Sequence, residues 1–512
     1  MTTRVSEVAL GAETLTPQDV IRVARHDARV VVTTEARARL ERSNAFLRRL
    51  ADSEEPVYGI STGFGALSTT RIPRESWGEL QRSLILSHAA GMGPPIEREV
   101  VRAMLLLRAR TLALGYSGVR PALVDSIVAL LNAGLTPVVP EYGSLGASGD
   151  LAPLAHASLP LLGEGVVTDR DGASVSAAQA LGSLGIEALV LGPKEGLSLI
   201  NGTDGMLGML VLACEDFGLL CRTADVTAAM SVEALLGTDT AFEPSIHELR
   251  PHPGQMASAA NLHRLLEGSA IVASHRDNDD RVQDAYSLRC APQVAGAARD
   301  VLDFARNVVG IELASAIDNP TVLDDGRLIS NGNFHGAPLG FAADFLAIAC
   351  AEVGSIAERR VDRLLDVTRS MGLAAFLAED PGIHSGMMIA QYTAAALVAE
   401  NRRLASPASV DSIPTSGMQE DHVSMGWGAA RKLRQALVNL TRILAVELVC
   451  SARALQLRAP LSPAATTAAV VALLDLAPGP DRILAPDLAL AADMIASGAV
   501  VEAASSVMGP LR

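Results

Sequence analysis

The chain is poor in aromatic residues and in cysteine, and basic side chains are fewer than acidic ones. Of 512 residues, 3% are aromatic and five are cysteine, and 42 Lys and Arg stand against 57 Asp and Glu, for a net charge of −15. An acidic chain with no Lys/Arg-rich block is not expected to bind nucleic acid or an anionic membrane. The cysteines occur singly, without CxxC spacing, which predicts free thiols in a reducing cytosol: Cys214, Cys221, Cys290, Cys350 and Cys450.

Long uncharged hydrophobic runs are also missing. No such run reaches the roughly 18 residues that a membrane span needs, and the opening MTTRVSEVAL has no apolar segment of the kind that directs secretion. The composition, 49% hydrophobic and 19% charged, excludes intrinsic disorder and supports a sizeable core. We therefore expect a soluble, cytoplasmic globular protein with neither membrane nor nucleic acid as partner.

Alternation of strand type is scarce, and Ala and Leu recur at helical spacings instead. Residues 100–107, 345–350 and 429–459 show this pattern, which is typical of helices packed closely through small side chains. The predicted fold class is therefore mainly α. Gly and Pro are dense before residue 204, and the helical stretches lengthen after residue 205. This predicts a loop-rich N-terminal domain over 1–204, followed by a long-helix bundle and C-terminal helices over 205–512.

Several common catalytic motifs are absent or out of context. The chain has no GxxxxGK[ST] phosphate loop and no HExxH metal motif. Residues 59–63 match GxSxG, but neither the preceding strand nor the following helix of a hydrolase elbow is evident around Ser61. His247 and His252 are five residues apart, a poor spacing for one helix face. We predict neither a metal nor a diffusible cofactor.

The most informative segment is GSLGASGDLAPL, residues 143–154. Taken locally, it is a glycine-rich turn in which Ser148 or Asp150 caps the next helix. The whole string, however, resembles the signature of the aromatic amino acid ammonia-lyases, in which Ala-Ser-Gly forms a prosthetic group. Six further motifs of that family follow its order between about residues 58 and 459: YGISTGFG (58–65), SHAAG (87–91), EGL with NGT (195–203), QDAYSLRC (283–290), NGNFHG (331–336) and QEDHVSM (419–425).

The resemblance implies that Ala147, Ser148 and Gly149 cyclise without another enzyme. The Gly149 nitrogen would attack the Ala147 carbonyl carbon, and loss of two waters, one from Ser148, would give 4-methylidene-imidazol-5-one (MIO). The residue types suit this chemistry, because Gly149 has no side chain to obstruct its nitrogen and Ser148 supplies a hydroxyl to eliminate. Asp150 is expected to assist cyclisation by orienting the tripeptide, although a helix N-cap is the rival interpretation.

Eliminating ammonia from an α-amino acid requires an electrophile, a base for the weakly acidic β-proton and a cation for the carboxylate. MIO would supply the electrophile, and Arg289 has the fork that matches a carboxylate. The base is Tyr58 or Tyr286, provided that the site lowers a pKa that is normally about 10. Two alternatives stay open: Tyr58 as a loop aromatic, and Arg289 as the partner of a nearby Asp.

Three more residues are assigned by the resemblance alone. The family places Asn201 beside the prosthetic group, holding it and the substrate, and gives Gln283 a similar role. Phe334 would form a wall of the substrate pocket. The alternatives are an ordinary helix cap for Asn201 and simple packing for Phe334.

Selectivity is predicted from three positions. Family members that act on phenylalanine carry an aromatic residue and Leu where this chain has Ser87-His88, and Gln where it has Glu420. Met388 also replaces a Lys that is frequent in the phenylalanine enzymes. An imidazole satisfies His88 and Glu420, whereas a phenyl ring leaves them unpaired at about 1–3 kcal/mol each. The alternative is that both pair only with protein groups.

The resemblance thus implies elimination of ammonia from L-histidine to give trans-urocanate, the first step of histidine degradation. It also implies a homotetramer whose active sites are each assembled from three subunits. Two alternatives are an MIO-dependent 2,3-aminomutase and a lyase for another aromatic amino acid; a third is a helical scaffold without activity. Asp204 and Met418 depart from the residues common in the family, Gln and Asn, which bears on fine selectivity only.

Overall fold

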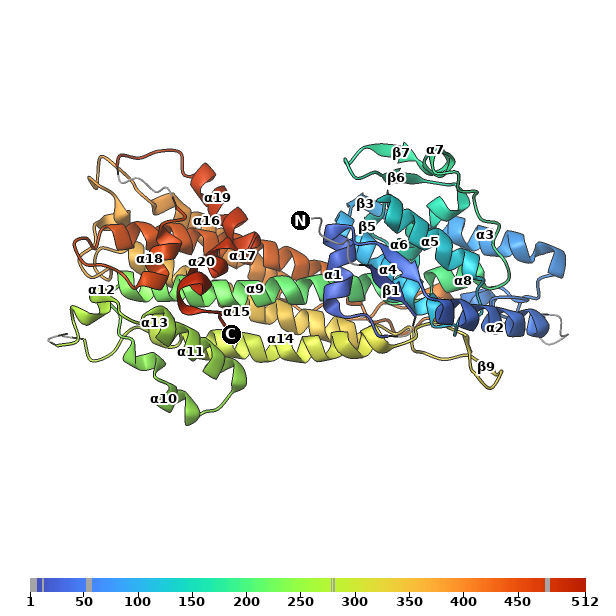
Figure 1. Cartoon of the computed structure of the whole chain (residues 1–512), viewed down its shortest axis with the longest axis horizontal. Coiled ribbons are helices and arrows are strands. Elements are labelled where there is room, and N and C mark those ends of the chain that lie inside the picture. Colours follow the sequence, from blue (N-terminus) through green and yellow to red (C-terminus); the bar gives the residue numbers. More distant parts are fainter. Residues whose placement is uncertain (1–6, 12, 52–57, 278, 280, 475–478) are drawn as a thin grey trace. The chain divides into compact units, whose positions relative to one another are not determined.

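The structure is a computed structural model (Figure 1), and the residues that it describes are 7–11, 13–51, 58–277, 279, 281–474 and 479–512. Helices dominate and the strands are short, so the predicted mainly α fold class is confirmed. Contacts divide the chain into two compact units. Unit 1 comprises Met1–Leu212, Arg306–Ala343 and Ala408–Arg431, and unit 2 comprises Ala213–Ala305, Asp344–Pro407 and Lys432–Arg512. The division at residues 204 and 205 stays a prediction.

Unit 1 holds many short helices and every strand found among the described residues. Its α-helices are α1 (Pro17–His26), α2 (Thr34–Ala51), α3 (Trp77–His88), α4 (Arg98–Ala113), α5 (Pro121–Ala133), α6 (Leu151–Ser158), α7 (Ala177–Ser183) and α8 (Glu195–Ile200). Its 3-10 helices are η1 (Gly65–Leu67), η2 (Arg74–Ser76), η3 (Leu159–Leu162) and η6 (Ser416–Met418).

The strands of unit 1 form four small sheets. One is the parallel pair β1 (Val8–Leu10) and β2 (Val30–Val32). The other three are antiparallel: β3 (Met92–Pro95) with β5 (Pro140–Tyr142); β4 (Thr136–Pro137), β6 (Val166–Thr168) and β7 (Ser174–Ser176); and β8 (Thr321–Val322) with β9 (Leu328–Ile329).

Helix α4 lies at the centre of unit 1, where it packs against α1, α2, α5 and α6. Every residue from Val100 to Ala113 is buried, including Arg102, Arg108 and Arg110, so the helix predicted from residues 100–107 lies in the core. Neighbouring helices begin and end on clear signals. Thr16 and Asp19 form a capping box at the start of α1, and Gly134 ends α5 in the left-handed conformation at φ 76°. The α3–α6–α8 layer beside α4 supports the loops of the candidate site.

Unit 2 is built almost wholly from helices. They are η4 (Thr240–Phe242), α10 (Pro244–Glu248), α11 (Pro253–Leu265), α12 (Ala270–Ala273), α13 (Tyr286–Arg289), η5 (Ala375–Leu377), α16 (Met388–Leu404), α18 (Ala465–Val471), α19 (Ala485–Ala496) and α20 (Ala499–Met508). The unit boundaries fall inside α9 (Asp204–Ala234), α14 (Ala291–Ala314), α15 (Ala337–Leu365) and α17 (Gly426–Gln456). The predicted helix over 429–459 is thus confirmed, with its end at Gln456.

Three helical stretches among the described residues are long and apolar enough to cross a membrane. They are Glu195–Ala234, Ala337–Leu365 and Gly426–Gln456, and 100%, 61% and 78% of their most apolar windows are buried inside the structure. Helices that are apolar on every side occur in the cores of large proteins as well as in membranes. Their burial therefore accounts for their composition without a bilayer.

Candidate active site

The Ala147-Ser148-Gly149 tripeptide lies in a tight loop between β5 and α6. Ser148 and Gly149 both adopt the left-handed conformation, at φ 52° and 83°, and the Gly149 N–H donates to the Gly146 carbonyl at 3.3 Å. A non-glycine residue rarely adopts such a φ, so Ser148 is held there by its surroundings. A Cβ on Gly149 would lie 2.1 Å from the Gly202 carbonyl oxygen, which only glycine avoids.

The Asp150 carboxylate ties this loop to a neighbouring helix through hydrogen bonds. Its Oδ2 accepts the backbone N–H groups of Gly205 and Met206, both at 2.9 Å, and Ser144 Oγ donates to its Oδ1 at 3.2 Å. Asp150 precedes α6 but makes no side-chain cap there; it instead binds the first turn of α9. The rival interpretation is thus partly right, because Asp150 caps a helix other than the adjacent one. Complete burial raises its pKa to about 7, against the lowering effect of these donors.

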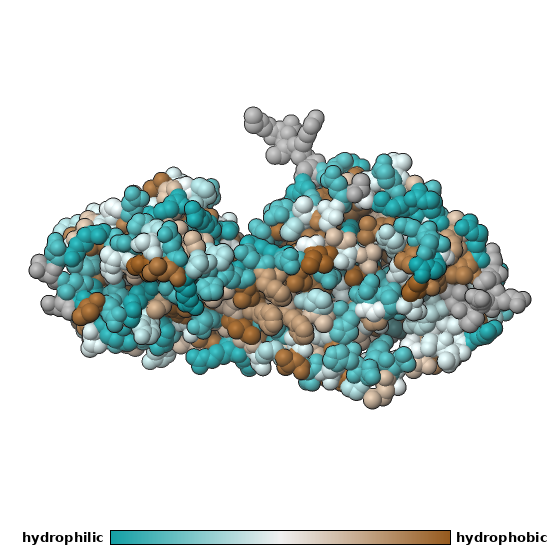
Figure 2. Space-filling model, turned by 90° about the horizontal axis from the view of Figure 1, so that it is seen from below, coloured by the Kyte–Doolittle hydropathy of each residue, from teal (hydrophilic) through white to brown (hydrophobic). Residues whose placement is uncertain are grey.

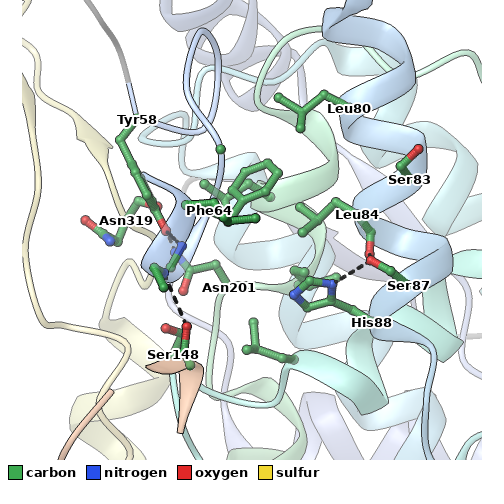
Figure 3. A pocket seen from close by; sticks show the side chains of 18 of the residues that line it. Tyr58, Phe64, Leu80, Ser83, Leu84, Ser87, His88, Ser148, Asn201 and Asn319 are labelled. Atoms are coloured by element: carbon green, nitrogen blue, oxygen red, sulfur yellow. Dashed lines mark hydrogen bonds between the residues drawn. The ribbon is translucent and has the colours of Figure 1, made fainter. Parts of the chain in front are cut away.

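The tripeptide borders a cavity of about 520 Å³ in unit 1. Figure 3 shows Tyr58, Phe64, Asn201 and Asn319 on one side of it and the helix with Leu84, Ser87 and His88 on the other. An adjoining cavity of about 460 Å³ shares Tyr58, Ser148, Asn319 and Glu420 with the first. The structure therefore brings together these predicted site residues: Tyr58, His88, Ala147, Ser148, Asn201, Phe334 and Glu420.

Tyr58 is held at the border of both cavities. Its hydroxyl oxygen accepts the Gly65 N–H at 3.2 Å, and its ring meets Phe64 edge to face at 6.2 Å. The Gly65 N–H occupies one lone pair of this oxygen and fixes its position at the cavity border. Tyr58 thus lies at the cavity with one hydrogen bond to the backbone, and its role as the base rather than as a loop aromatic stays a prediction.

His88 and Glu420 lie in the same cavity as Ser148. The Ser87 hydroxyl is 3.2 Å from His88 Nδ1, and Thr415 Oγ1 donates to Glu420 Oε2 at 3.1 Å. Burial lowers the pKa of His88, and the charge of Glu420 partly opposes this. His88 is therefore neutral near pH 7, and a neutral imidazole has one donor and one acceptor nitrogen.

Gln283, Tyr286 and Arg289 belong to unit 2. They line a separate cavity of about 330 Å³ together with Arg281, Arg363 and Arg369. None of Gln283, Tyr286 and Arg289 is among the described residues that line the two unit 1 cavities. Tyr286 is 70% exposed, and the Arg289 guanidinium lies 4.7 Å from its ring centroid. Arg289 donates to the Asp284 backbone oxygen at 2.9 Å, and the Asp284 carboxylate pairs with Arg281 instead.

Two further residues of the site were not predicted. Asn319 lines both unit 1 cavities, and its Oδ1 accepts the Asn331 N–H at 2.9 Å, which turns its NH₂ group away from that contact. An Asn before a Pro is a turn signal in the sequence whatever its side chain contacts. His335 lines the second cavity, where its ring stacks on His422 at 5.7 Å. Its presence in the NGNFHG motif was the available signal.

Comparison with known proteins assigns the family. The model of the aromatic amino acid lyases matches residues 15–475. The histidine ammonia-lyase of Streptomyces avermitilis is 57% identical over 98% of this chain and 99% of its own length, and that of Symbiobacterium thermophilum is 52% identical over 99% of each. The chain belongs to the aromatic amino acid lyase family.

Solved structures of related enzymes agree with this family in fold. A histidine ammonia-lyase from Trypanosoma cruzi is 39% identical with a TM-score of 0.90, and it covers 98% of this chain and 95% of its own. A tyrosine aminomutase from Streptomyces globisporus is 40% identical with a TM-score of 0.92, over 99% and 100% of the two chains. Fold alone therefore does not separate lyases from aminomutases, so the choice depends on the site.

Proposed function

We propose that this chain acts as a histidine ammonia-lyase, which eliminates ammonia from L-histidine to give trans-urocanate. The observation that carries the proposal is that His88 and Glu420 line the same cavity as Ser148 and Tyr58. Besides their bonds to Thr415 and Ser87, the Glu420 carboxylate and the neutral His88 imidazole can form further hydrogen bonds to an imidazole ring, and a phenyl ring can form none of them. Full-length relatives named histidine ammonia-lyase at 57% identity support the same substrate.

The residues present fit an MIO group formed from Ala147, Ser148 and Gly149. The left-handed turn exposes the Ser148 side chain to the cavity, and the contact with Gly202 leaves room only for glycine at position 149. Once formed, MIO would supply the electrophile that activates the amino group of the substrate for departure. Asp150 would hold the loop in place through its bonds to Gly205 and Met206.

The remaining roles fall to side chains that bind, orient or move a proton. Tyr58 lies at the cavity beside Ser148 and would remove the β-proton, with Tyr286 as the second candidate. Arg289 would bind the substrate carboxylate, helped by the NH₂ group of Asn319. Gln283 and Asn201 would orient the substrate, and Phe334 would form a wall.

We also propose a homotetramer with shared sites, which the family resemblance implies and the same requirement supports. The chemistry needs a carboxylate-binding cation, and the predicted one, Arg289, lies in the unit 2 cavity with the exposed Tyr286. A second copy that presents its own cavity would supply both. Figure 2 shows hydrophobic patches on the molecular surface, and Phe304, Phe345 and Ile348 of unit 2 are each nearly half exposed, which suits a subunit interface. We place the enzyme in the cytoplasm, with no membrane or nucleic acid as partner.

Product analysis tests the proposal. Purified protein incubated with L-histidine should release ammonium and trans-urocanate, which is followed by its ultraviolet absorbance. An aminomutase would instead accumulate β-histidine. Urocanate in excess over β-histidine supports the lyase, whereas β-histidine as the main product, or no turnover of histidine, rejects it.

A further inference from the structure

A buried polar network lies behind the wall of the unit 1 cavity. Lys194, wholly buried at the start of α8, donates from Nζ to Asp318 Oδ2 at 2.6 Å, Ser198 Oγ at 3.0 Å and the Ser117 carbonyl at 3.3 Å. These three bonds use all the donors of an ammonium group. A buried ion pair is costly unless its hydrogen bonds are satisfied, so this one is held in a single arrangement.

The second carboxylate oxygen of Asp318, Oδ1, faces Asn201. Asp318 Oδ1 accepts the Asn319 N–H at 2.7 Å and lies 3.5 Å from Asn201 Nδ2. Asn201 Nδ2 also donates to the Asn319 carbonyl at 2.8 Å. Both neighbours of this nitrogen are therefore acceptors. A flipped carboxamide would place its oxygen against a carboxylate and a carbonyl, so the network decides which atom occupies this position.

The opposite atom of the carboxamide is left without a partner. Asn201 is 2% exposed and lines the cavity with Ser148, and its Oδ1 has no hydrogen-bond partner among the described residues. Figure 3 shows the side chain between those of Tyr58 and Ser148. A buried acceptor without a donor is unfavourable until a ligand supplies an N–H group. A carboxylate cannot supply one.

We propose that Asp318, fixed by Lys194, is a positioning residue that turns the oxygen of Asn201 toward the cavity, where it accepts a hydrogen bond from the α-amino group of the substrate. This inference rests on the proposed function for the identity of the substrate. It adds that the site distinguishes an amino acid from its deaminated product through one acceptor. Lys194 and Asp318 act only through Asn201 and do not touch the substrate.

Asp318→Asn is the informative substitution, because it keeps the side-chain volume. Its oxygen stays with the Lys194 ammonium, so its NH₂ group faces Asn201 and favours the flipped carboxamide, with nitrogen toward the cavity. Binding is measured by calorimetry in the Ser148→Ala background, where L-histidine is not consumed. The comparison ligand is 3-(imidazol-4-yl)propanoate, which keeps the ring and the carboxylate but lacks the amino group.

The expected result is selective. Asp318→Asn should weaken L-histidine binding at least about tenfold and change binding of the propanoate less than about threefold. When Asn201→Ala is already present, adding Asp318→Asn should change L-histidine binding by less than about threefold, because the residue through which it acts is gone. A purely structural role of the ion pair would weaken both ligands equally, and would do so with or without Asn201.

A second variant keeps the test valid if Asp318→Asn fails to fold. Lys194→Met combined with Asp318→Leu removes the pair without leaving a lone charge, and thermal unfolding shows which variant is folded. It should show the same selective loss, since only the Asn319 carbonyl then holds the Asn201 nitrogen. Equal weakening of both ligands in a folded variant overturns the inference. Turnover of L-histidine by the wild-type protein is measured separately. If the wild type forms urocanate but the variant weakens both ligands equally, this inference alone is rejected. If the variant weakens only L-histidine binding but the wild type forms no urocanate, only the proposed function is rejected.

Discussion

Gly149 lies so close to Gly202 that a Cβ on the former would be 2.1 Å from the carbonyl oxygen of the latter. The two glycines belong to different loops, and the Asp150 N–H donates to the same carbonyl at 2.8 Å. The tripeptide thus lies directly against a second backbone segment. This leaves no space for a side chain on Gly149, the residue whose backbone nitrogen must attack.

Gly149→Ala should therefore prevent formation of the prosthetic group. The added methyl forces the loop away from Gly202, and we expect the full sequence mass, no loss of two waters, and activity below detection. The matched control is Gly172→Ala. Gly172 has φ 82°, almost the φ of Gly149, but nothing lies within 4 Å of the added Cβ. It should cost only backbone strain of about 1 kcal/mol and keep the mass deficit. Loss of two waters in Gly149→Ala would contradict this account.

Asp150→Asn should change how stability depends on pH. Burial raises the pKa of Asp150 from 3.8 to about 7, so between these values the folded chain holds a proton that the unfolded chain has released. Its stabilising contribution is complete below the unfolded pKa and is lost as pH rises through about 7. Asn does not titrate, so the melting temperature of the variant should rise relative to that of the wild type between about pH 4 and pH 7. Parallel melting curves across this range would show that Asp150 is ionised throughout.

Ring selectivity is expected to follow His88 and Glu420. Replacing Ser87-His88 by Phe-Leu and Glu420 by Gln removes polar groups with which a phenyl ring can form no hydrogen bond. The phenylalanine-to-histidine ratio of kcat/KM should rise at least about tenfold, or about 1.4 kcal/mol, and activity on L-histidine should fall. Glu79→Gln, on the same helix α3 but outside the cavity lining, serves as control. An unchanged ratio in a folded triple variant that carries the group would mean that these residues do not contact the ring.

The carboxylate role of Arg289 is tested by Arg289→Lys, which keeps the charge but loses the two-pronged geometry. We expect kcat/KM to fall at least about tenfold. Arg369→Lys is the control, because Arg369 lines the same unit 2 cavity but is already paired with Asp362 and Asp366. Kinetics unchanged in Arg289→Lys, or an equal loss in the control, would reject the assignment.

Much of the fold, and the predicted residues around the two unit 1 cavities, could be identified from the sequence. Periodic apolar runs such as that of α4 predict buried helices directly, since the spacing of side chains on a helix is local information. Family motifs likewise predicted Tyr58, His88, Ser148, Asn201 and Glu420, and the structure places all five around one cavity.

The rest depends on contacts that local patterns do not encode. Asn319 could not be predicted as a site residue, because Asn-Pro has the same local turn signature whether or not the side chain faces a cavity. Asp150 was expected beside α6, yet its partners Gly205 and Met206 lie more than 50 positions along the chain. The roles of Gln283, Tyr286 and Arg289 stay predictions, because these residues lie in the unit 2 cavity.

The intact mass of the purified protein, measured together with its activity, tests the central claim most directly. We predict that the wild-type chain is lighter than its sequence mass by two waters and converts L-histidine to urocanate. Ser148→Ala should have its full sequence mass, a similar melting temperature and almost no activity. A wild-type protein at full sequence mass that still deaminates L-histidine would contradict the account.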